Sequence, residues 1–327
     1  MPTMQAIRLT QPCSTAQMVP VTVARPTLKP GYVLIKIKAF GINPSEVISR
    51  RGQSDPDFSY PRILGIEGVG VVAAANSGSM FKVGQQVAAL MGGLGREIDG
   101  TYAEYTLARE NGVIPFTSAL DWDVLGALPE TLQTAYGSLR RGLHLHTGDV
   151  LLVHGGTSTV GLMATALAKQ AGATVIATTR NRQKLAAITK DGADHAVLDD
   201  AQLAATVRQL APDGVDKVLE LVGADKLIDD MQLLKEGGRA CLTGSLDGCW
   251  TLPNFSPFAI PTGTFLTSYG GAASDLPVEV LAAVLSKVEA GQIPVQIAKV
   301  YHGLAEAGQA QADLESSQDV GKHVVVL

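Results

Sequence analysis

The sequence predicts an α/β protein built from two domains, a partly open β-barrel and a doubly wound parallel sheet. The chain has 327 residues, 46% of them hydrophobic, and a single hydrophobic core stops growing well before that length. The first third holds short strand patterns separated by Gly, Pro, Asn and Ser, whereas strand and helix patterns alternate from about residue 120. These observations favour two cores of different architecture.

The first domain opens on a strand pattern at residues 33–40, where Lys36 and Lys38 alternate with apolar side chains. Such alternation is typical of a half-buried strand. Residues 69–72 and 86–90 are further short strand candidates. Short strands separated by Gly, Pro, Asn and Ser residues predict a partly open barrel and not a sandwich of long strands.

In the second domain, strand patterns alternate with helix patterns. Residues 149–153 (DVLLV) form the continuous apolar run of a fully buried parallel strand. The helix predicted next carries apolar residues at helical spacing and ends at Gly172; these residues are Val160, Met163, Leu167 and Ala171. Later strands are predicted at residues 174–178, 217–222 and 239–243, with a helix carrying Leu227, Met231 and Leu234 before the last. Alternating strand and helix predicts a doubly wound sheet.

The end of the chain breaks this alternation. A helix is predicted over residues 278–289, stopped by Gly291, and a final strand over residues 323–327. We expect these elements to return to the first domain. The predicted division is therefore residues 1–122 and 265–327 for the first domain and residues 123–264 for the second.

Composition excludes several classes of partner. The net charge is −5 with both signs interspersed, which gives no electrostatic footprint for nucleic acid. No apolar run approaches the roughly 20 residues of a membrane span, and the N-terminus lacks a signal-peptide pattern. Cys13, Cys241 and Cys249 show no metal-type spacing. The sequence predicts a reduced, cytoplasmic protein with neither nucleic-acid nor membrane partners.

A Gly-rich turn at residues 154–161 (HGGTSTVG) joins the first strand of the second domain to its helix. Backbone N–H groups and the helix dipole there could face a pyrophosphate, and Gly161 would let the helix approach the sheet. The strict G-x-G-x-x-G pattern is not met, because Ser158 and Thr159 stand where glycines would help. The prediction therefore depends on the strand before the turn and the helix after it. The alternative is an ordinary strand-to-helix turn. The expected cofactor contacts are Gly156, Thr157, Ser158, Thr159 and Val160.

The next strand ends in residues 178–184 (TTRNRQK), which contain no acid. An NAD-preferring site places a carboxylate there for the ribose 2′-hydroxyl. Thr179, Arg180 and Lys184 are instead the expected contacts, because a cation can bind a 2′-phosphate. A solvated basic turn is the alternative, although cations are mildly unfavourable at a helix start. The sequence favours NADPH as the cofactor.

With these features in place, the chain resembles the medium-chain dehydrogenase/reductase superfamily, in its zinc-free quinone oxidoreductase (zeta-crystallin-like) branch. Besides the nucleotide turn, the matching stretches are residues 41–46 (GINPSE), 61–72 (PRILGIEGVGVV), 134–136 (TAY), 234–239 (LKEGGR) and 321–322 (GK). They keep their order over nearly the whole chain. The resemblance implies a GroES-like first domain, a Rossmann second domain, an active site in the cleft between them, and a homodimer or homotetramer.

The zinc ligands of related enzymes are absent from this sequence. Zinc-dependent relatives have a His in the Gly-x-Glu segment and a Cys ahead of the first helix, where this chain has Ile66 and Asn43. Neither can serve as the usual catalytic zinc ligand. No Cys quartet is present for a structural zinc, and His144 and His146 are a poor ligand pair. The sequence predicts no metal site.

The resemblance also assigns roles to single residues. It places Asn43 beside the nicotinamide and the substrate oxygen, as the candidate catalytic and cofactor-contacting residue, although Asn43 would also suit as a helix cap. Glu67 is expected to make structural hydrogen bonds, and Glu220 replaces the more usual Asp. Further cofactor contacts are implied at Thr134, Val222, Gly244 and Ser245.

Two positions depart from the family pattern. A Tyr often found five residues after the Asn is Ile48 here, which puts a quinone-stacking pocket in doubt. A C-terminal Arg near the 2′-phosphate is Ser317. Phosphate recognition is therefore expected to rest on Arg180 and Lys184.

Three functions follow as hypotheses. The first is an NADPH-dependent quinone reductase, in which Asn43 orients the acceptor oxygen and catalysis rests on proximity in a dry cleft. The second is an NADPH-dependent reductase of enoyl thioesters or other activated alkenes, which usually needs a Tyr as proton donor; Tyr60 is the nearby candidate, but its place before Pro61 looks structural. The third is an NADPH-binding sensor or structural protein with little turnover, favoured by the lack of a clear acid.

Overall fold

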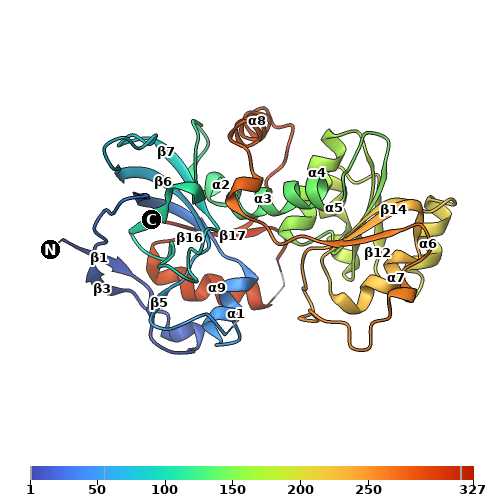
Figure 1. Ribbon diagram of the computed structural model, residues 1–327, viewed down its shortest axis with the longest axis horizontal. Helices are drawn as coiled ribbons and strands as arrows, with labels where there is room; N and C mark the ends of the chain where they lie inside the picture. The colour runs from blue at the N-terminus through green and yellow to red at the C-terminus, as the bar shows by residue number, and fades with distance from the viewer. Residues whose placement is uncertain (1, 55, 317–318) are drawn as a thin grey trace. The chain divides into compact units, whose positions relative to one another are not determined.

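A computed structural model describes residues 2–54, 56–316 and 319–327. The chain divides into two compact units (Figure 1): unit 1 comprises Met1–Glu130 and Ala272–Leu327, and unit 2 comprises Thr131–Gly271. Each unit has its own sheet and its own hydrophobic core. The expected pair of cores within an α/β chain is therefore present.

Unit 1 is built on a mainly antiparallel sheet in the order β16-β17-β4-β6-β7-β9, with β8 also paired to β4. Its strands are β4 (Tyr32–Gly41), β6 (Glu67–Ala74), β7 (Gln86–Leu90), β8 (Tyr105–Arg109), β9 (Val113–Pro115), β16 (Ile297–His302) and β17 (Lys322–Val326). Two small sheets pair β1 (Thr3–Ala6) with β3 (Val21–Ala24), and β2 (Arg8–Leu9) with β5 (Arg62–Ile63). The strands predicted at residues 33–40, 69–72, 86–90 and 323–327 are all found.

The alternation of apolar and polar residues in β4 places its apolar side chains in the core of unit 1. Val33, Ile35 and Ile37 are buried, whereas Lys36 between them is exposed. Phe40 stacks on Tyr102 with ring centroids 4.6 Å apart. The helices of this unit are α1 (Pro44–Arg50), α2 (Trp122–Gly126), α8 (Val278–Glu289) and α9 (Ala307–Ser316). Helix α8 has the bounds that the sequence predicted.

Helix α9 is anchored to α1 by a buried arginine. Arg50 donates from Nε to Gln311 Oε1 at 2.7 Å, and its Nη2 lies 2.6 Å from Glu315 Oε1. A third bond runs from Nη1 to the carbonyl of Cys13 at 2.7 Å. Because all three partners lie far from Arg50 in sequence, this side chain joins the N-terminal and C-terminal parts of unit 1.

Unit 2 is a six-stranded parallel sheet in the order β12-β11-β10-β13-β14-β15. Its strands are β10 (Val150–His154), β11 (Thr174–Thr179), β12 (His195–Leu198), β13 (Val215–Glu220), β14 (Leu234–Leu242) and β15 (Phe265–Ser268). Its helices are α4 (Thr159–Gln170), α5 (Leu185–Lys190), α6 (Leu203–Leu210), α7 (Leu227–Met231) and a π-helix (Ser138–Gly142). Helix α3 (Pro129–Gly137) crosses the boundary between the units.

The structure differs from the predicted division at both ends of unit 2. Strand β15 pairs parallel with β14, so residues 265–271 belong to the parallel sheet and not to the first domain. Residues 123–130 belong to unit 1. An edge strand such as β15 is only partly buried, so its sequence lacks the apolar run by which buried strands were found. Helix α7 ends at Met231, and Leu234, expected in that helix, begins β14.

No helix of the described residues is long and apolar enough to cross a membrane.

Candidate functional site

The predicted nucleotide turn lies where the strand order of unit 2 reverses. The turn follows β10, which has β11 on one side and β13 on the other. In open parallel sheets, ligands bind beyond the carboxyl ends of the strands at such a reversal. The turn therefore lies where a dinucleotide binds in this type of sheet.

Three glycines give the turn its shape. Gly155 has φ +91°, a left-handed conformation that L side chains rarely adopt. A Cβ on Gly156 would lie 2.9 Å from Ala177 Cβ, and one on Gly161 would lie 2.5 Å from the Gly155 carbonyl oxygen. Gly156 thus lets the turn approach β11, and Gly161 lets α4 approach the turn. A larger residue at either position would push the backbone away.

Ser158 compensates for the departure from the strict glycine pattern. It is the N-cap of α4, and its Oγ accepts from the Gly161 N–H at 3.0 Å and donates to the Gly155 carbonyl at 2.8 Å. The hydroxyl therefore joins the two ends of the turn. It also satisfies one of the N–H groups that a helix start leaves unpaired. The remaining N–H groups and the helix dipole favour an anion at this end of α4.

The basic segment after β11 lies beside this turn. Thr179 is buried, and its Oγ1 lies 3.4 Å from Thr157 Oγ1. Arg180 follows directly and is exposed, whereas Lys184 is half-buried at the end of a short 3₁₀ helix. Asn181 caps that helix by accepting from the Gln183 N–H at 2.9 Å. The two cations expected to bind a 2′-phosphate therefore follow the carboxyl end of β11.

The ends of β13 and β14 bring further predicted residues to the turn. The Leu221 N–H donates to the His154 carbonyl at 3.1 Å, and a Cβ on Gly155 would lie 3.4 Å from Val222 Cγ2. The Gly244 N–H points to the Glu220 carbonyl at 3.4 Å. Ser245 lies next along the chain, where its Oγ donates to Asp247 Oδ1 at 3.3 Å.

Thr134 joins the same edge of the sheet through Ser138. The Ser138 hydroxyl donates to the Thr134 carbonyl at 2.6 Å and lies 3.0 Å from Thr243 Oγ1 at the end of β14. Unit 2 thus gathers every predicted cofactor residue except Asn43. Asn43 belongs to unit 1.

Asn43 precedes α1, but its side chain does not cap that helix. Its backbone N–H donates to Glu46 Oε2 at 2.9 Å, whereas its amide Nδ2 donates to Glu67 Oε1 at 3.0 Å. Its Oδ1 accepts from Lys322 Nζ at 2.5 Å. The alternative role as a side-chain cap is therefore not observed. The amide instead joins a buried charged network.

That network is centred on Glu67 and Lys322, both almost completely buried. Lys322 Nζ lies 2.8 Å from Glu67 Oε1 and 3.4 Å from Glu130 Oε2. The other oxygen of Glu67 accepts from the Glu130 N–H at 2.7 Å. Glu67 makes the structural hydrogen bonds expected of it. Lys322 was missed as a site residue, although it ends the Gly-Lys stretch that contributed to the resemblance.

The chain matches two known protein families. The alcohol dehydrogenase GroES-like domain family matches residues 29–118, and the zinc-binding dehydrogenase family matches residues 159–286. Human quinone oxidoreductase is 30% identical over 227 residues, which are 68% of this chain and 67% of that protein. The chain belongs to the medium-chain dehydrogenase/reductase superfamily, in its quinone oxidoreductase-like branch.

Other relatives extend the match over almost the full length. Pig quinone oxidoreductase is 27% identical over 310 residues, covering 93% of this chain and 92% of that protein. Squalestatin tetraketide synthase of Phoma sp. is 28% identical over 320 residues, but the match covers only 12% of that synthase. The relatives therefore support an oxidoreductase of this superfamily over almost the whole chain.

Solved structures confirm the predicted fold class, a GroES-like domain joined to a Rossmann domain. A mycobacterial protein complexed with NADPH has a TM-score of 0.85 at 27% identity and covers 99% of this chain and 100% of that one. An NAD-dependent alcohol dehydrogenase has a TM-score of 0.87 at 25% identity, with coverage of 99% and 100%. This oxidoreductase thus belongs to a pyridine-nucleotide-dependent family whose members use either cofactor.

A carboxylate with a strongly shifted pKa lies beside Asn43 in this oxidoreductase. Glu46 accepts from the Ile66 N–H at 2.8 Å through Oε1, and from the Asn43 N–H and the Tyr102 hydroxyl, at 2.9 and 2.7 Å, through Oε2. Complete burial raises the pKa of the Glu46 carboxyl to about 7, although these hydrogen bonds lower it. The ionised form therefore costs free energy that its donors only partly offset.

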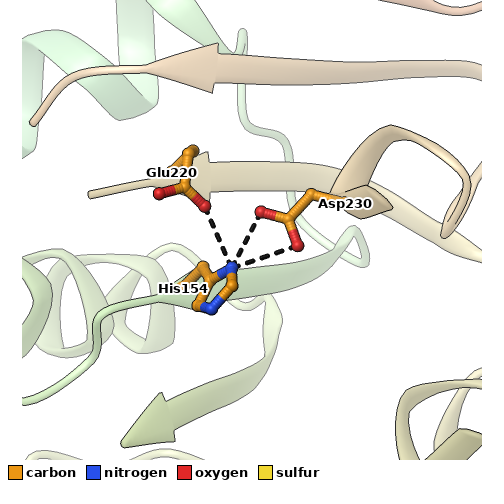
Figure 2. A group of neighbouring side chains, drawn as sticks. All are labelled: His154, Glu220 and Asp230. Atoms are coloured by element: carbon orange, nitrogen blue, oxygen red, sulfur yellow. Dashed lines mark hydrogen bonds and ion pairs between the residues drawn. The ribbon is translucent and has the colours of Figure 1, made fainter. Parts of the chain in front are cut away.

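A second charged cluster lies at the start of the nucleotide turn, where His154, the last residue of β10, meets Glu220 of β13 and Asp230 of α7 (Figure 2). His154 Nδ1 lies 2.9 Å from Asp230 Oδ2 and 3.0 Å from Glu220 Oε2. On the other side of the ring, Nε2 lies 3.2 Å from Asp199 Oδ2. Burial lowers the pKa of His154, but the three carboxyl groups outweigh burial and raise it to about 12.

This cluster is best explained as a buried imidazolium between acids. Burial raises the pKa of Asp230 well above its usual range, whereas hydrogen bonds from Asp230 and His154 outweigh burial and lower that of Glu220. His154, Glu220 and Asp230 are also the one group of described residues whose atoms could hold a metal ion. Each ring nitrogen lies within 3.2 Å of a carboxylate oxygen, so a protonated ring forms ion pairs with these acids, although His154 Nε2 and Glu220 Oε2 make no hydrogen bond within the described residues. The prediction of no metal site stays a prediction.

No local pattern in the sequence indicated this cluster. His154, Asp199, Glu220 and Asp230 are spread along the chain, and β12, which positions Asp199, was not predicted. The available signal was the short apolar run at residues 196–198 (AVL). Asp199 also lies next to the predicted phosphate site, since its N–H donates to the Thr179 carbonyl at 2.9 Å.

Two further predictions concern single residues. The Tyr60 hydroxyl donates to the Ser49 carbonyl at the end of α1 at 2.5 Å, in agreement with its structural interpretation. Ser317, expected to replace a phosphate-binding arginine, lies outside the described residues.

Proposed function

We propose that this oxidoreductase is an NADPH-dependent quinone reductase that works without zinc. The observation that carries the proposal is Asn43, whose Oδ1 and one N–H are held by Lys322 and Glu67. An amide at this position can donate a hydrogen bond to an acceptor oxygen, but it polarises that oxygen far less than a metal ion would. A quinone suits such a site because it is already electrophilic. The relatives named quinone oxidoreductase support the same substrate class.

The choice of NADPH rests on the segment after β11. Arg180 is exposed and Lys184 half-buried there, and no acid stands between residues 178 and 184. Bound NADPH would supply the hydride. The turn at residues 155–158 and the N-terminus of α4 would hold the pyrophosphate, and Arg180 would bind the 2′-phosphate through a fork of N–H donors. Asn43 would orient the acceptor.

The test measures NADPH and NADH oxidation with 1,4-naphthoquinone. We expect quinone-dependent oxidation with a higher kcat/KM for NADPH. In Arg180→Ala with Lys184→Ala, that value should fall about 10- to 100-fold for NADPH, the scale of one or two lost charged hydrogen bonds, while NADH is little affected. Arg208→Ala in α6 is a matched control for loss of a surface cation. Equal use of NADH by the unaltered protein would contradict the NADPH assignment.

One observation favours a second candidate, the reduction of enoyl thioesters or other activated alkenes. The match to a tetraketide synthase covers 93% of this chain. Against it, the Tyr60 hydroxyl is engaged with Ser49, so this tyrosine is not placed as a proton donor. Turnover of a crotonyl thioester without turnover of quinone would decide for this candidate. NADPH binding without turnover of either acceptor would decide for a sensor or structural role.

Assembly and location complete the proposal. We propose a homodimer or homotetramer, tested by light scattering of the purified protein. A cytoplasmic location is proposed from the cysteines, since Cys13, Cys241 and Cys249 are all free thiols.

A further inference from the structure

The orientation of the Asn43 amide is fixed by charge. Its oxygen faces the ammonium of Lys322 at 2.5 Å, and its nitrogen faces the Glu67 carboxylate at 3.0 Å. If the amide were flipped, its NH₂ would face the ammonium and its oxygen would face the carboxylate. Both contacts would then be repulsive, because an ammonium has only donors and a carboxylate only acceptors. One orientation therefore satisfies the network.

The fold holds the two charged partners in place. Glu67 Oε2 is held by the backbone N–H of Glu130, so the carboxylate cannot rotate freely. Lys322 begins β17, which pairs antiparallel with the end of β4. A Cβ on Gly41 would lie 2.4 Å from Lys322 Cε and 2.5 Å from Glu67 Oε1. The glycine at the end of β4 thus makes room for the pair to reach Asn43.

One N–H of the amide is left over. Nδ2 carries two protons, of which Glu67 accepts one, and Asn43 makes no other side-chain hydrogen bond within the described residues. Lys322 Nζ occupies one lone pair of Oδ1 and keeps the oxygen facing the ammonium, so the group that the held amide can offer a ligand is its second N–H. A free amide could instead turn its oxygen outward and offer an acceptor.

We propose that Lys322 is a positioning residue, which holds the Asn43 amide so that its second N–H is presented to the acceptor oxygen. The inference rests on the proposed role of Asn43 and adds a specificity. At this point the site favours ligands that present an oxygen lone pair, such as a quinone or thioester carbonyl, over groups that have only donors, such as an ammonium. Lys322 acts through Asn43 and does not itself touch the substrate.

The variants must not leave a lone buried charge. Lys322→Met alone would leave the buried Glu67 carboxylate without its cation and destabilise the fold, so the test combines it with Glu67→Gln. The matched control is Lys217→Met, because Lys217 is also a buried lysine and lies 3.7 Å from Asp149 in unit 2. Asn43→Ala provides a second background in which Lys322 has no amide to orient.

The first readout does not depend on activity. In protein labelled with ¹⁵N-asparagine, the side-chain signals of Asn43 are assigned by their loss in Asn43→Ala. We expect both Nδ2 protons to exchange slowly in the unaltered protein and in Lys217→Met. In the double variant they should exchange at least about ten-fold faster, since the amide is no longer held. Unchanged exchange in the double variant would overturn the proposal, whatever reaction the enzyme catalyses.

The second readout separates positioning from a general structural role. We expect the double substitution to lower kcat with naphthoquinone on the order of ten-fold, with little change in the Kd for NADPH. The same substitution should have no further effect on kcat in the Asn43→Ala background. Equal losses in both backgrounds would mean a purely structural role and overturn the proposal. Lys322→Arg, which keeps a cationic donor, should retain more kcat than the double variant.

The two proposals fail in different ways. If the unaltered enzyme binds NADPH but reduces no quinone, the proposed function is refuted, and proton exchange still decides the role of Lys322. If quinone is reduced and exchange is unaffected by the double substitution, the function stands and Lys322 is not a positioning residue.

Discussion

Nδ1 of His154 lies 2.9 Å from Oδ2 of Asp230, which ties the last residue of β10 to helix α7 at the start of the nucleotide turn. Both side chains are buried. The charge on the imidazole ring therefore contributes to holding together the sheet edge at which the cofactor residues gather.

The stability of the fold should depend on pH through His154. Because its folded-state pKa is about 12 against an ordinary value of 6.5, the charged ring stabilises fully below pH about 6.5, and this contribution is lost as the pH rises toward the folded value. The advantage of the native protein over His154→Gln should shrink by about 1 kcal/mol per pH unit above pH 7. Urea unfolding at pH 6.5, 7.5 and 8.5 measures it. His146→Gln, an exposed histidine, is the control, and a pH-independent difference would contradict the assignment.

Glu46 should produce a pH dependence at lower pH. Burial holds its folded-state pKa at about 7, above the ordinary 4.5, so the folded state binds the extra proton and stability falls as pH rises from about 4.5 to 7. The stability of the native protein relative to Glu46→Gln should therefore decrease by about 1 kcal/mol per pH unit across that window. Denaturant titrations from pH 5 to 8 test this, with the exposed Glu236→Gln as control. A relative stability that rises with pH would show the opposite sign of shift.

Gly161 should be needed for NADPH binding. A Cβ there would lie 2.5 Å from the Gly155 carbonyl oxygen, so Gly161→Ala should push α4 away from the turn and weaken NADPH binding at least about ten-fold, equal to about 1.4 kcal/mol. Gly270→Ala is the matched control, because nothing lies within 4 Å of a Cβ at that position. Fluorescence titration of NADPH measures both. The same Kd in the two variants would mean that the turn does not hold the cofactor.

Arg50 and Arg51 form two ion pairs that share the Glu315 carboxylate, one buried and one exposed. Both guanidinium groups lie 2.6 Å from Glu315 Oε1, but the side chain of Arg50 is 5% exposed and that of Arg51 is 52% exposed. Arg50→Met should cost about 3–5 kcal/mol because it breaks a buried network, whereas Arg51→Met should cost less than about 1 kcal/mol. Thermal unfolding of the two variants tests this. Equal losses would mean that burial does not control the strength of these pairs.

Much of the local structure could be predicted from the sequence. The bounds of β7 and α8 agree with the prediction to the residue, and β10, the glycine turn and α4 follow in the expected order. Buried parallel strands and amphipathic helices leave a pattern in neighbouring residues, so a local pattern is enough to find them. The edge strand β15 left no such pattern and was assigned to the wrong domain.

The roles of single residues were predicted less completely. The resemblance singled out Asn43, but not that its side chain would turn away from α1 toward Glu67 and Lys322. A cap is a local interaction that competes with any partner the fold brings near. Here the buried charges on β6 and β17 provide stronger partners for the amide than the helix start does.

The amino-acid sequence was enough to predict the α/β class, the longer buried strands, several helices, the glycine turn and the basic segment that follows β11. Only the tertiary structure decided which distant side chains meet: His154 with Asp199, Glu220 and Asp230, and Asn43 with Glu67 and Lys322. The physical reason is that backbone preference and burial act between neighbours in sequence. The partners of a buried charge are set instead by the order of strands in the sheet, which brings together the ends of segments far apart in the chain.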